Sequence, residues 1–95
     1  MSQSVLAIDD QPEIHQVLDV RLQPEGLQIH HALDASDGMH KALTLQPDLI
    51  LLDVDMPEVS GFELCQRLKA NPHTSSIPVI LRSAWRYWTL ITSRS

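Results

Sequence analysis

A run of four apolar residues that ends abruptly on an acid constrains most strongly what this 95-residue chain can fold into. Residues 49–52 read Leu-Ile-Leu-Leu, Asp53 follows directly, and Asp55 lies two positions later. A short continuous apolar run is typical of a strand covered on both faces, as in the middle of a parallel sheet. Open α/β sheets bind their ligands at the carboxyl ends of such strands. Asp53 is therefore predicted to lie at a binding edge, although an Asp after a strand is more commonly a turn residue.

Three further segments have strand character, and segments with helical spacing of apolar residues separate them. The segments 5–8 and 77–81 are apolar runs, whereas residues 27–33 alternate like an edge strand. The predicted strands cover residues 5–8, 27–33, 49–52 and 77–81. The apolar positions of the predicted helices are Ile14, Val17, Leu18 and Leu22, then Met39, Ala42 and Leu43 as an inward face, then Phe62, Leu64, Cys65 and Leu68.

Local signals set the ends of the helices. Pro12 suits a first helical turn, and the segment from Pro24 to Gly26 is expected to end that helix. Either Asp34 or Ser36 is expected to cap the second helix. Gly61 is expected to permit a sharp backbone turn before the third.

Strands that alternate with helices indicate a parallel α/β sheet with right-handed crossovers. We expect a doubly wound sheet of order 2-1-3-4, in which the first and third strands lie side by side at the switch point. Asp9 and Asp10 follow the first strand as Asp53 follows the third, so three carboxylates are predicted to meet in one crevice. Such carboxylates repel one another unless a cation neutralises them, and oxygen ligands of this kind suit Mg²⁺.

Charge and composition exclude several other classes of function. The net charge of −5 provides no basic stripe for phosphates, so we expect no direct binding to nucleic acid. The N-terminus lacks the basic region of a secretory signal, and no apolar run approaches the roughly 20 residues of a membrane helix. We therefore expect a soluble, cytoplasmic chain without a membrane partner. The single Cys65 is compatible with a reducing compartment and is expected to be a small core residue.

The five histidines are expected to be structural or solvated rather than metal ligands. His30 and His31 are adjacent on a strand, so their side chains face opposite ways and form a poor chelate. His15, His40 and His73 are predicted to lie on helix or loop surfaces.

The pattern Asp-x-x-Met-Pro-x-x-x-Gly from Asp53 to Gly61, behind four apolar residues, resembles the phosphoacceptor segment of response-regulator receiver domains. The resemblance implies a signalling domain rather than an enzyme, in which Asp53 takes a phosphoryl group from a histidine kinase or a phosphotransfer protein. It implies that Mg²⁺ is held by Asp9, Asp10, Asp53 and the backbone carbonyl of Asp55. It also implies that the hydroxyl of Ser83, after Pro-Val-Ile-Leu-Arg, hydrogen-bonds the phosphoryl group.

The resemblance extends from Val5 to Ala84. Residues 1–84 are therefore expected to form an incomplete receiver domain, and residues 85–95 an atypical tail. A complete receiver continues with a helix, a fifth strand that ends in Lys-Pro, and a last helix, which we expect to be missing or replaced here. The exposed fourth strand, or the tail with its three aromatic residues, is then predicted to pair with a second copy of the chain.

Two other functions remain open at this point. Leu-Leu-Asp-Val-Asp at residues 51–55 also resembles the opening of haloacid-dehalogenase-like phosphatases, which use the two acids as nucleophile and general acid. Pro57, the earlier pair Asp9 and Asp10, and the small size of the chain argue against this alternative. The other possibility is a degenerate receiver that keeps the fold and acts only as a binding module.

Overall fold

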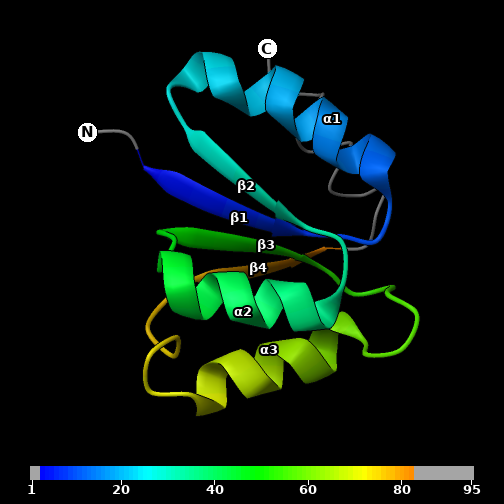
Figure 1. Ribbon diagram of the computed structural model, residues 1–95, viewed down its shortest axis with the longest axis vertical. Helices are drawn as coiled ribbons and strands as arrows, with labels where there is room; N and C mark the ends of the chain where they lie inside the picture. Colours follow the sequence, from blue (N-terminus) through cyan, green and yellow to red (C-terminus); the bar gives the residue numbers. More distant parts are fainter. Residues whose placement is uncertain (1–2, 83–95) are drawn as a thin grey trace.

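The computed structural model describes residues 3–82, in which strands and helices alternate along the chain (Figure 1). The strands are β1 (Ser4–Ile8), β2 (Gln28–Ala32), β3 (Leu49–Asp53) and β4 (Val79–Arg82). The helices are α1 (Pro12–Leu22), α2 (Ala35–Leu45) and α3 (Gly61–Ala70), and a short 3₁₀ helix, η1 (Gln23–Glu25), follows α1. Each predicted element is therefore present, with strand boundaries that differ by one to two residues from those expected.

The four described strands form one parallel sheet in the order β2-β1-β3-β4, which confirms the predicted topology. Ile8 at the end of β1 lies opposite Ala32 on one side and Leu52 on the other. At the end of β3, Asp53 lies opposite Arg82 of β4. The carboxyl ends of β1 and β3 are thus neighbours, and the segments that follow them leave the sheet at the same edge.

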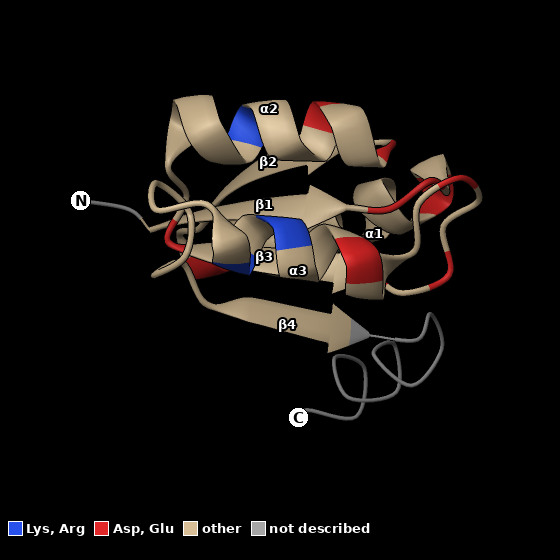
Figure 2. Cartoon of the chain, turned by 90° about the horizontal axis from the view of Figure 1, so that it is seen from below, with Lys and Arg blue, Asp and Glu red and all other residues tan. Residues whose placement is uncertain are grey.

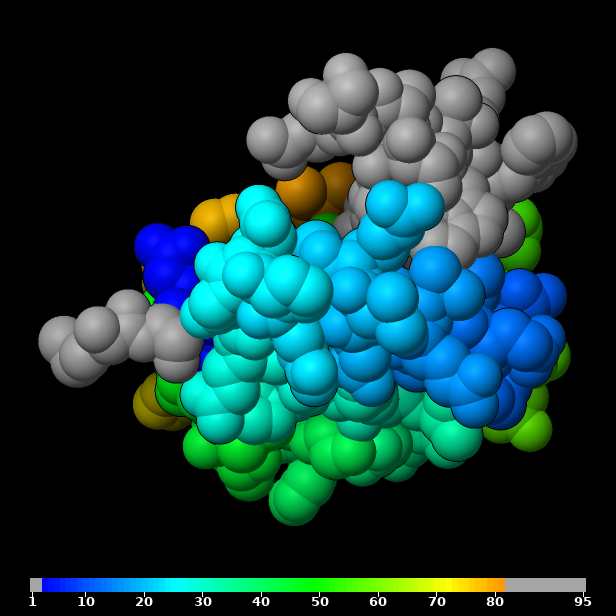
Figure 3. All heavy atoms as spheres, turned by 90° about the horizontal axis from the view of Figure 1, so that it is seen from above, coloured from blue at the N-terminus to red at the C-terminus, as the bar shows by residue number. Residues whose placement is uncertain are grey.

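Helices cover both faces of the sheet: α1 lies on one face, and α2 and α3 lie on the other (Figure 1). Figure 3, which views the molecule from the side of α1, shows the surface that α1 and η1 form in blue to cyan. Alternate residues of the central strands serve two cores, which explains why their sequences are apolar without interruption. Leu6, Ile8, Ile50 and Leu52 belong to the core that includes Leu64 and Leu68 of α3; Val5, Ala7 and Leu51 pack with Leu18 of α1.

One position of the predicted inward face of α2 is wrong: Leu43 is 36% exposed, whereas Gly38 and Ala42 are the buried residues of this helix. The reason is a close approach between α2 and β1. A Cβ atom at Gly38 would lie 2.7 Å from Cδ1 of Ile8, so the helix contacts the sheet along its glycine side. Leu43 is turned away from this contact. Cys65, in contrast, packs against the core with a partly buried side chain, as expected.

Helix α2 begins at a side-chain cap. Asp34 has an extended backbone, and its Oδ1 accepts a hydrogen bond from the backbone N–H of Asp37 at 2.7 Å. Of the two predicted caps, Asp34 is therefore the one that the structure uses, because Ser36 already lies inside the helix.

We expect Asp34→Ala to lower the free energy of unfolding by about 1 kcal/mol, because the N–H of Asp37 loses its acceptor. Ser36→Ala is the control and should change the free energy by less than about 0.5 kcal/mol. Urea unfolding followed by circular dichroism measures both values. Equal losses in the two variants would contradict the assignment of the cap.

Candidate functional site

Three carboxylates converge where β1 and β3 end. One oxygen from each of Asp9, Asp10 and Asp53 lies within 4.8 Å of the others. Asp9 and Asp53 are buried, with 0% and 2% of their surface exposed, and Asp10 is partly exposed. Figure 2 shows acidic positions in the segments that leave the carboxyl ends of these strands. The predicted convergence of these three side chains is therefore confirmed.

The two buried carboxylates are oriented in the same way. Oδ1 of Asp9 accepts the backbone N–H of Gln11 at 2.9 Å, and Oδ1 of Asp53 accepts the backbone N–H of Asp55 at 3.1 Å. Each acid thus bonds to the residue two positions later, as Asp side chains do in tight turns. Because Oδ1 of each residue is held by its own turn, the local backbone fixes the direction of both carboxylates.

Helix α3 begins directly against the end of β3. The backbone N–H of Gly61 donates to the carbonyl of Val54 at 3.2 Å, and Ser60 caps the helix by accepting the N–H of Glu63. A Cβ atom on Gly61 would lie 2.2 Å from the carbonyl oxygen of Asp53. The sequence predicts a sharp turn at Gly61, but this glycine is a helical residue without positive φ. The structure requires glycine here because two backbone segments touch.

Two further predicted site residues, Asp55 and Ser83, are not among the three carboxylates of this cluster. Asp55 follows Asp53 and its side chain is exposed, and its backbone carbonyl as a metal ligand stays a prediction. Ser83 and the tail from residue 85 lie outside the described residues. Within residues 3–82, no helix is both long enough and apolar enough to cross a bilayer.

One residue beside the acids escaped the sequence-based prediction. His15 was expected on the surface of α1, but it is 6% exposed, and its Nε2 lies 2.8 Å from the carbonyl oxygen of Asp9. Its Nδ1 lies 2.6 Å from Nδ1 of His31 on β2. Helical spacing provides the missed signal, since His15 precedes Leu18 by three positions and Leu22 by seven, and both leucines pack in the core under α1.

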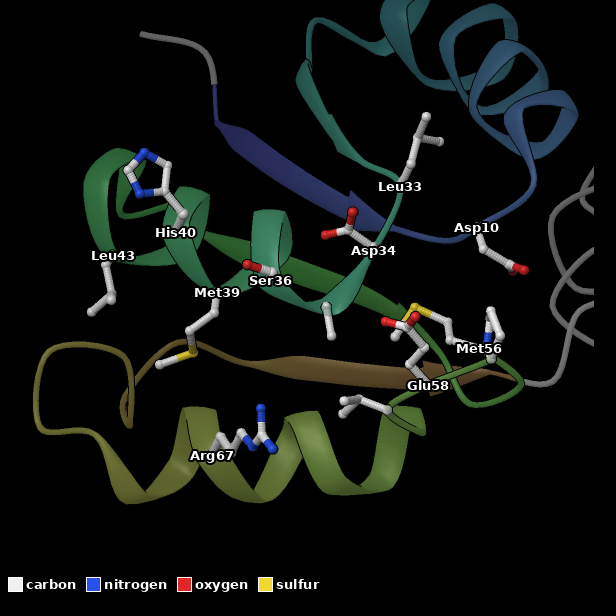
Figure 4. A pocket seen from close by; sticks show the side chains of 13 residues that line it. Asp10, Leu33, Asp34, Ser36, Met39, His40, Leu43, Met56, Glu58 and Arg67 are labelled. Atoms are coloured by element: carbon white, nitrogen blue, oxygen red, sulfur yellow. The ribbon is translucent and has the colours of Figure 1, made fainter.

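A cavity of about 750 Å³ lies next to the acids, between α2, α3 and the segment that follows β3. Figure 4 shows Asp10 and Asp34 at its upper side, Met39 and Met56 within it, and Arg67 on α3. Asp10 therefore belongs both to the acid cluster and to the wall of this cavity. Because Asp10 is partly exposed and lines this cavity, the acid cluster can be reached from this side.

The donor set suits a hard divalent cation. All three side chains offer carboxylate oxygens, and two of them are buried where their mutual repulsion is least screened by water. Mg²⁺ prefers oxygen ligands and binds through a few carboxylates while it keeps several waters. The residues present therefore fit Mg²⁺, and the cluster is an acidic site suited to a metal ion.

Comparisons with known proteins agree with this geometry. The sequence matches the family described as response regulator receiver domain over residues 5–91, which extends past the end of the motif resemblance at Ala84. It is 41% identical over 80 residues to the DNA-binding dual master transcriptional regulator RpaA of Synechocystis. The aligned region covers 84% of this chain and 33% of that protein. This chain thus spans about a third of the length of that curated relative.

Two solved structures are similar to this chain over most of its length. The N-terminal domain of a response regulator receiver protein from Methanoculleus marisnigri has a TM-score of 0.80 and 32% identity, covering 82% of this chain and 63% of that one. A chain in the crystal structure of histidine kinase ThkA in complex with response regulator protein TrrA has a TM-score of 0.79 and 30% identity, covering 87% and 70%. The match of the family over most of the sequence, together with the parallel sheet and its acid cluster, shows that this chain belongs to the response regulator receiver domains.

Proposed function

We propose that this chain is the phosphoacceptor domain of a two-component signalling system, in which Asp53 receives a phosphoryl group. The observation that supports the proposal most strongly is the position of Asp53. Its buried carboxylate ends the central strand and shares one crevice with Asp9 and Asp10. A nucleophile at the edge where open α/β sheets bind their ligands is well situated for a phosphorylated partner.

The reaction is a transfer between a phosphohistidine and a carboxylate. An oxygen of Asp53 attacks phosphorus, the bond from phosphorus to the imidazole nitrogen of the donor breaks, and an acyl phosphate forms. The bond electrons remain on the departing nitrogen. When bound, Mg²⁺ neutralises charge on the phosphoryl oxygens. The chain contributes the nucleophile and its orientation, because the N–H of Asp55 holds Oδ1 of Asp53.

We further propose that Asp9, Asp10, Asp53 and the backbone carbonyl of Asp55 hold Mg²⁺, and that Ser83 hydrogen-bonds the phosphoryl group. The oxygen-only donor set supports the metal assignment. The partner is proposed to be a histidine kinase or a phosphotransfer protein, and a receiver relative described in a complex with a histidine kinase supports this. The division into a receiver domain over residues 1–84 and a separate tail stays a prediction.

Phosphorylation from a small phosphodonor tests the proposed function. The purified chain, incubated with acetyl phosphate and Mg²⁺, is expected to gain one phosphoryl group per chain by intact mass, in a linkage that hydroxylamine cleaves. A phosphomonoester such as p-nitrophenyl phosphate should not be hydrolysed at a steady rate. Steady hydrolysis would favour the haloacid-dehalogenase-like alternative, to which the response-regulator relatives give no support. Absence of label despite bound Mg²⁺ would indicate a degenerate receiver.

We expect Asp10→Asn to weaken Mg²⁺ binding about tenfold or more, because one of three converging carboxylates loses its charge. Glu25→Gln on η1 removes the same charge far from the cluster and serves as the matched control. Titration of Mg²⁺ followed by the fluorescence of the chain, or by calorimetry, measures both affinities. If the two variants bind equally well, Asp10 is not a ligand of the metal ion.

The predicted homodimer remains a proposal. Among the described strands β4 is at an edge of the sheet, and Ile80 and Leu81 on it are exposed. An apolar edge strand is a template for pairing with another chain. Light scattering across a dilution series is expected to show dissociation of a dimer. A monomer at every concentration would contradict this proposal without affecting that of phosphorylation.

A further inference from the structure

A chain of polar contacts leads from the surface of α1 to the acid site. Oδ1 of Asp19 lies 2.8 Å from Nε2 of His31, Nδ1 of His31 lies 2.6 Å from Nδ1 of His15, and Nε2 of His15 lies 2.8 Å from the carbonyl oxygen of Asp9. The two imidazole rings meet edge to face, with their centroids 4.6 Å apart. His15 is buried, whereas Asp19 and His31 are partly exposed.

The chemistry of these partners determines where the ring protons lie. A carbonyl and an ionised carboxylate accept hydrogen bonds and donate none, so Nε2 of both rings carries a proton. The two Nδ1 atoms face each other at 2.6 Å, where one proton fits between them. Two protons would collide, and none would leave two lone pairs in opposition. Oδ1 of Asp19, 2.8 Å from Nε2 of His31, accepts the proton at that end of the pair.

The backbone of Asp9 is held by this chain of contacts at its carbonyl and by the sheet at its N–H. The N–H of Asp9 donates to the carbonyl of Ala32 at 3.0 Å, and the carbonyl of Asp9 accepts from His15. His31 is itself fixed, because Lys41 of α2 donates to its backbone carbonyl. The hydrogen bonds of His15 therefore connect the acid pair after β1 to elements that are anchored on both faces of the sheet.

We propose that His15 is a positioning residue for the acid site: the proton it shares with His31 fixes its ring, and its Nε2–H holds the Asp9 peptide in the orientation that directs both carboxylates toward a cation. The proposal rests on the Mg²⁺ binding proposed above. It gives His15 a role in that binding, although the side chain contacts Asp9 only at its backbone carbonyl. Hydrogen bonds that orient ligand residues commonly change metal affinity by a factor of ten or more.

Substitutions at His15 test whether its donor or its volume is required. His15→Leu removes the donor and is expected to weaken Mg²⁺ binding about tenfold and to shift the NMR resonance of the Asp10 amide, which belongs to the same peptide. His15→Gln retains an N–H at similar reach and should restore the affinity to within about threefold of wild type. His73→Gln, on an exposed turn, is the matched control and should change neither readout. Equal losses in His15→Leu and His15→Gln, or wild-type behaviour of His15→Leu, would overturn the proposal.

The proton count has its own measurement, which needs neither Mg²⁺ nor phosphorylation. Nitrogen-15 NMR of the imidazole rings, after treatment with a chelator, is expected to show Nε2–H on both His15 and His31 and one further proton shared between their Nδ1 atoms. Asp19→Asn should shift the signals of His31 more than those of His15. Two neutral rings without a shared proton would overturn the proposed link. If the wild-type chain bound no Mg²⁺, the proposed function would fail, while these spectra and the Asp10 amide would still decide whether His15 holds the peptide.

Discussion

Asp53→Asn is expected to reduce phosphorylation by acetyl phosphate below detection. The amide of Asn has no nucleophilic carboxylate oxygen, so no acyl phosphate can form. The substitution keeps the size of the side chain, and the amide oxygen can still accept the N–H of Asp55 that now bonds Oδ1 at 3.1 Å. The fold should therefore be retained, because the amide has the same shape and keeps the hydrogen bond of this turn. Intact mass and urea unfolding measure the two effects.

Asp48→Asn provides the matched control at the opposite end of the sheet. Asp48 precedes β3, and its carboxylate accepts the backbone N–H of Ser4. This variant should be labelled to the wild-type extent. If the Asp53→Asn protein still gained a phosphoryl group, on a histidine or a serine, the assignment of Asp53 as the phosphoacceptor would be wrong.

Gly61→Ala is expected to lower the free energy of unfolding by about 3 kcal/mol or more, the upper range for forcing extra atoms into a packed interior. The added Cβ would lie 2.2 Å from the carbonyl oxygen of Asp53 and 2.7 Å from Cα of Val54. Both are backbone atoms and cannot rotate away, so α3 has to move from the end of β3. For a domain of this size the Tm falls by roughly 4 °C or more per kcal/mol, so the Tm of this variant should be lower by at least about 10 °C.

A second effect of Gly61→Ala should appear at the acid site. Displacement of α3 disturbs the segment that carries Asp53 and Asp55, so Mg²⁺ affinity should fall together with stability. Gly26→Ala is the matched control: Gly26 has φ of 80° and nothing within 4 Å of an added Cβ, so only backbone strain of about 1 kcal/mol is expected. Calorimetry with and without Mg²⁺ compares the two. A Gly61→Ala protein as stable as Gly26→Ala would mean that the contact relaxes easily.

The sequence was sufficient to predict the sheet and the meeting of three acids. Buried parallel strands leave a strong signal in the sequence, because both faces of the strand pack against helices. Neighbouring residues such as Ile50 and Leu51 belong to different cores, and both must be apolar. Once the strand order is known, the carboxyl ends of β1 and β3 are neighbours, and the acids that follow them have to meet. The order of these strands, together with the acids at their carboxyl ends, therefore accounts for most of the prediction.

What the sequence could not predict depends on contacts between helices and the sheet. The inward face of α2 was misassigned at Leu43, because the close contact of Gly38 with Ile8 rotates the helix and leaves no trace in hydrophobic spacing. His15 was assigned to the surface because a histidine is compatible with either side of a helix. Its burial depends on acceptors supplied by Asp9 and His31, which only the folded chain brings together.

The side-by-side ends of β1 and β3 also have a thermodynamic consequence. Asp9 and Asp53 come from distant parts of the sequence and are neighbours only after the two strands have paired, so the unfolded chain offers a cation no comparable site. A cation bound there is a ligand of the native state alone, and at a hundred times its dissociation constant it adds about 2.7 kcal/mol to the free energy of unfolding. The concentration of free Mg²⁺ would then set the equilibrium stability of the folded domain as well as its readiness for phosphorylation.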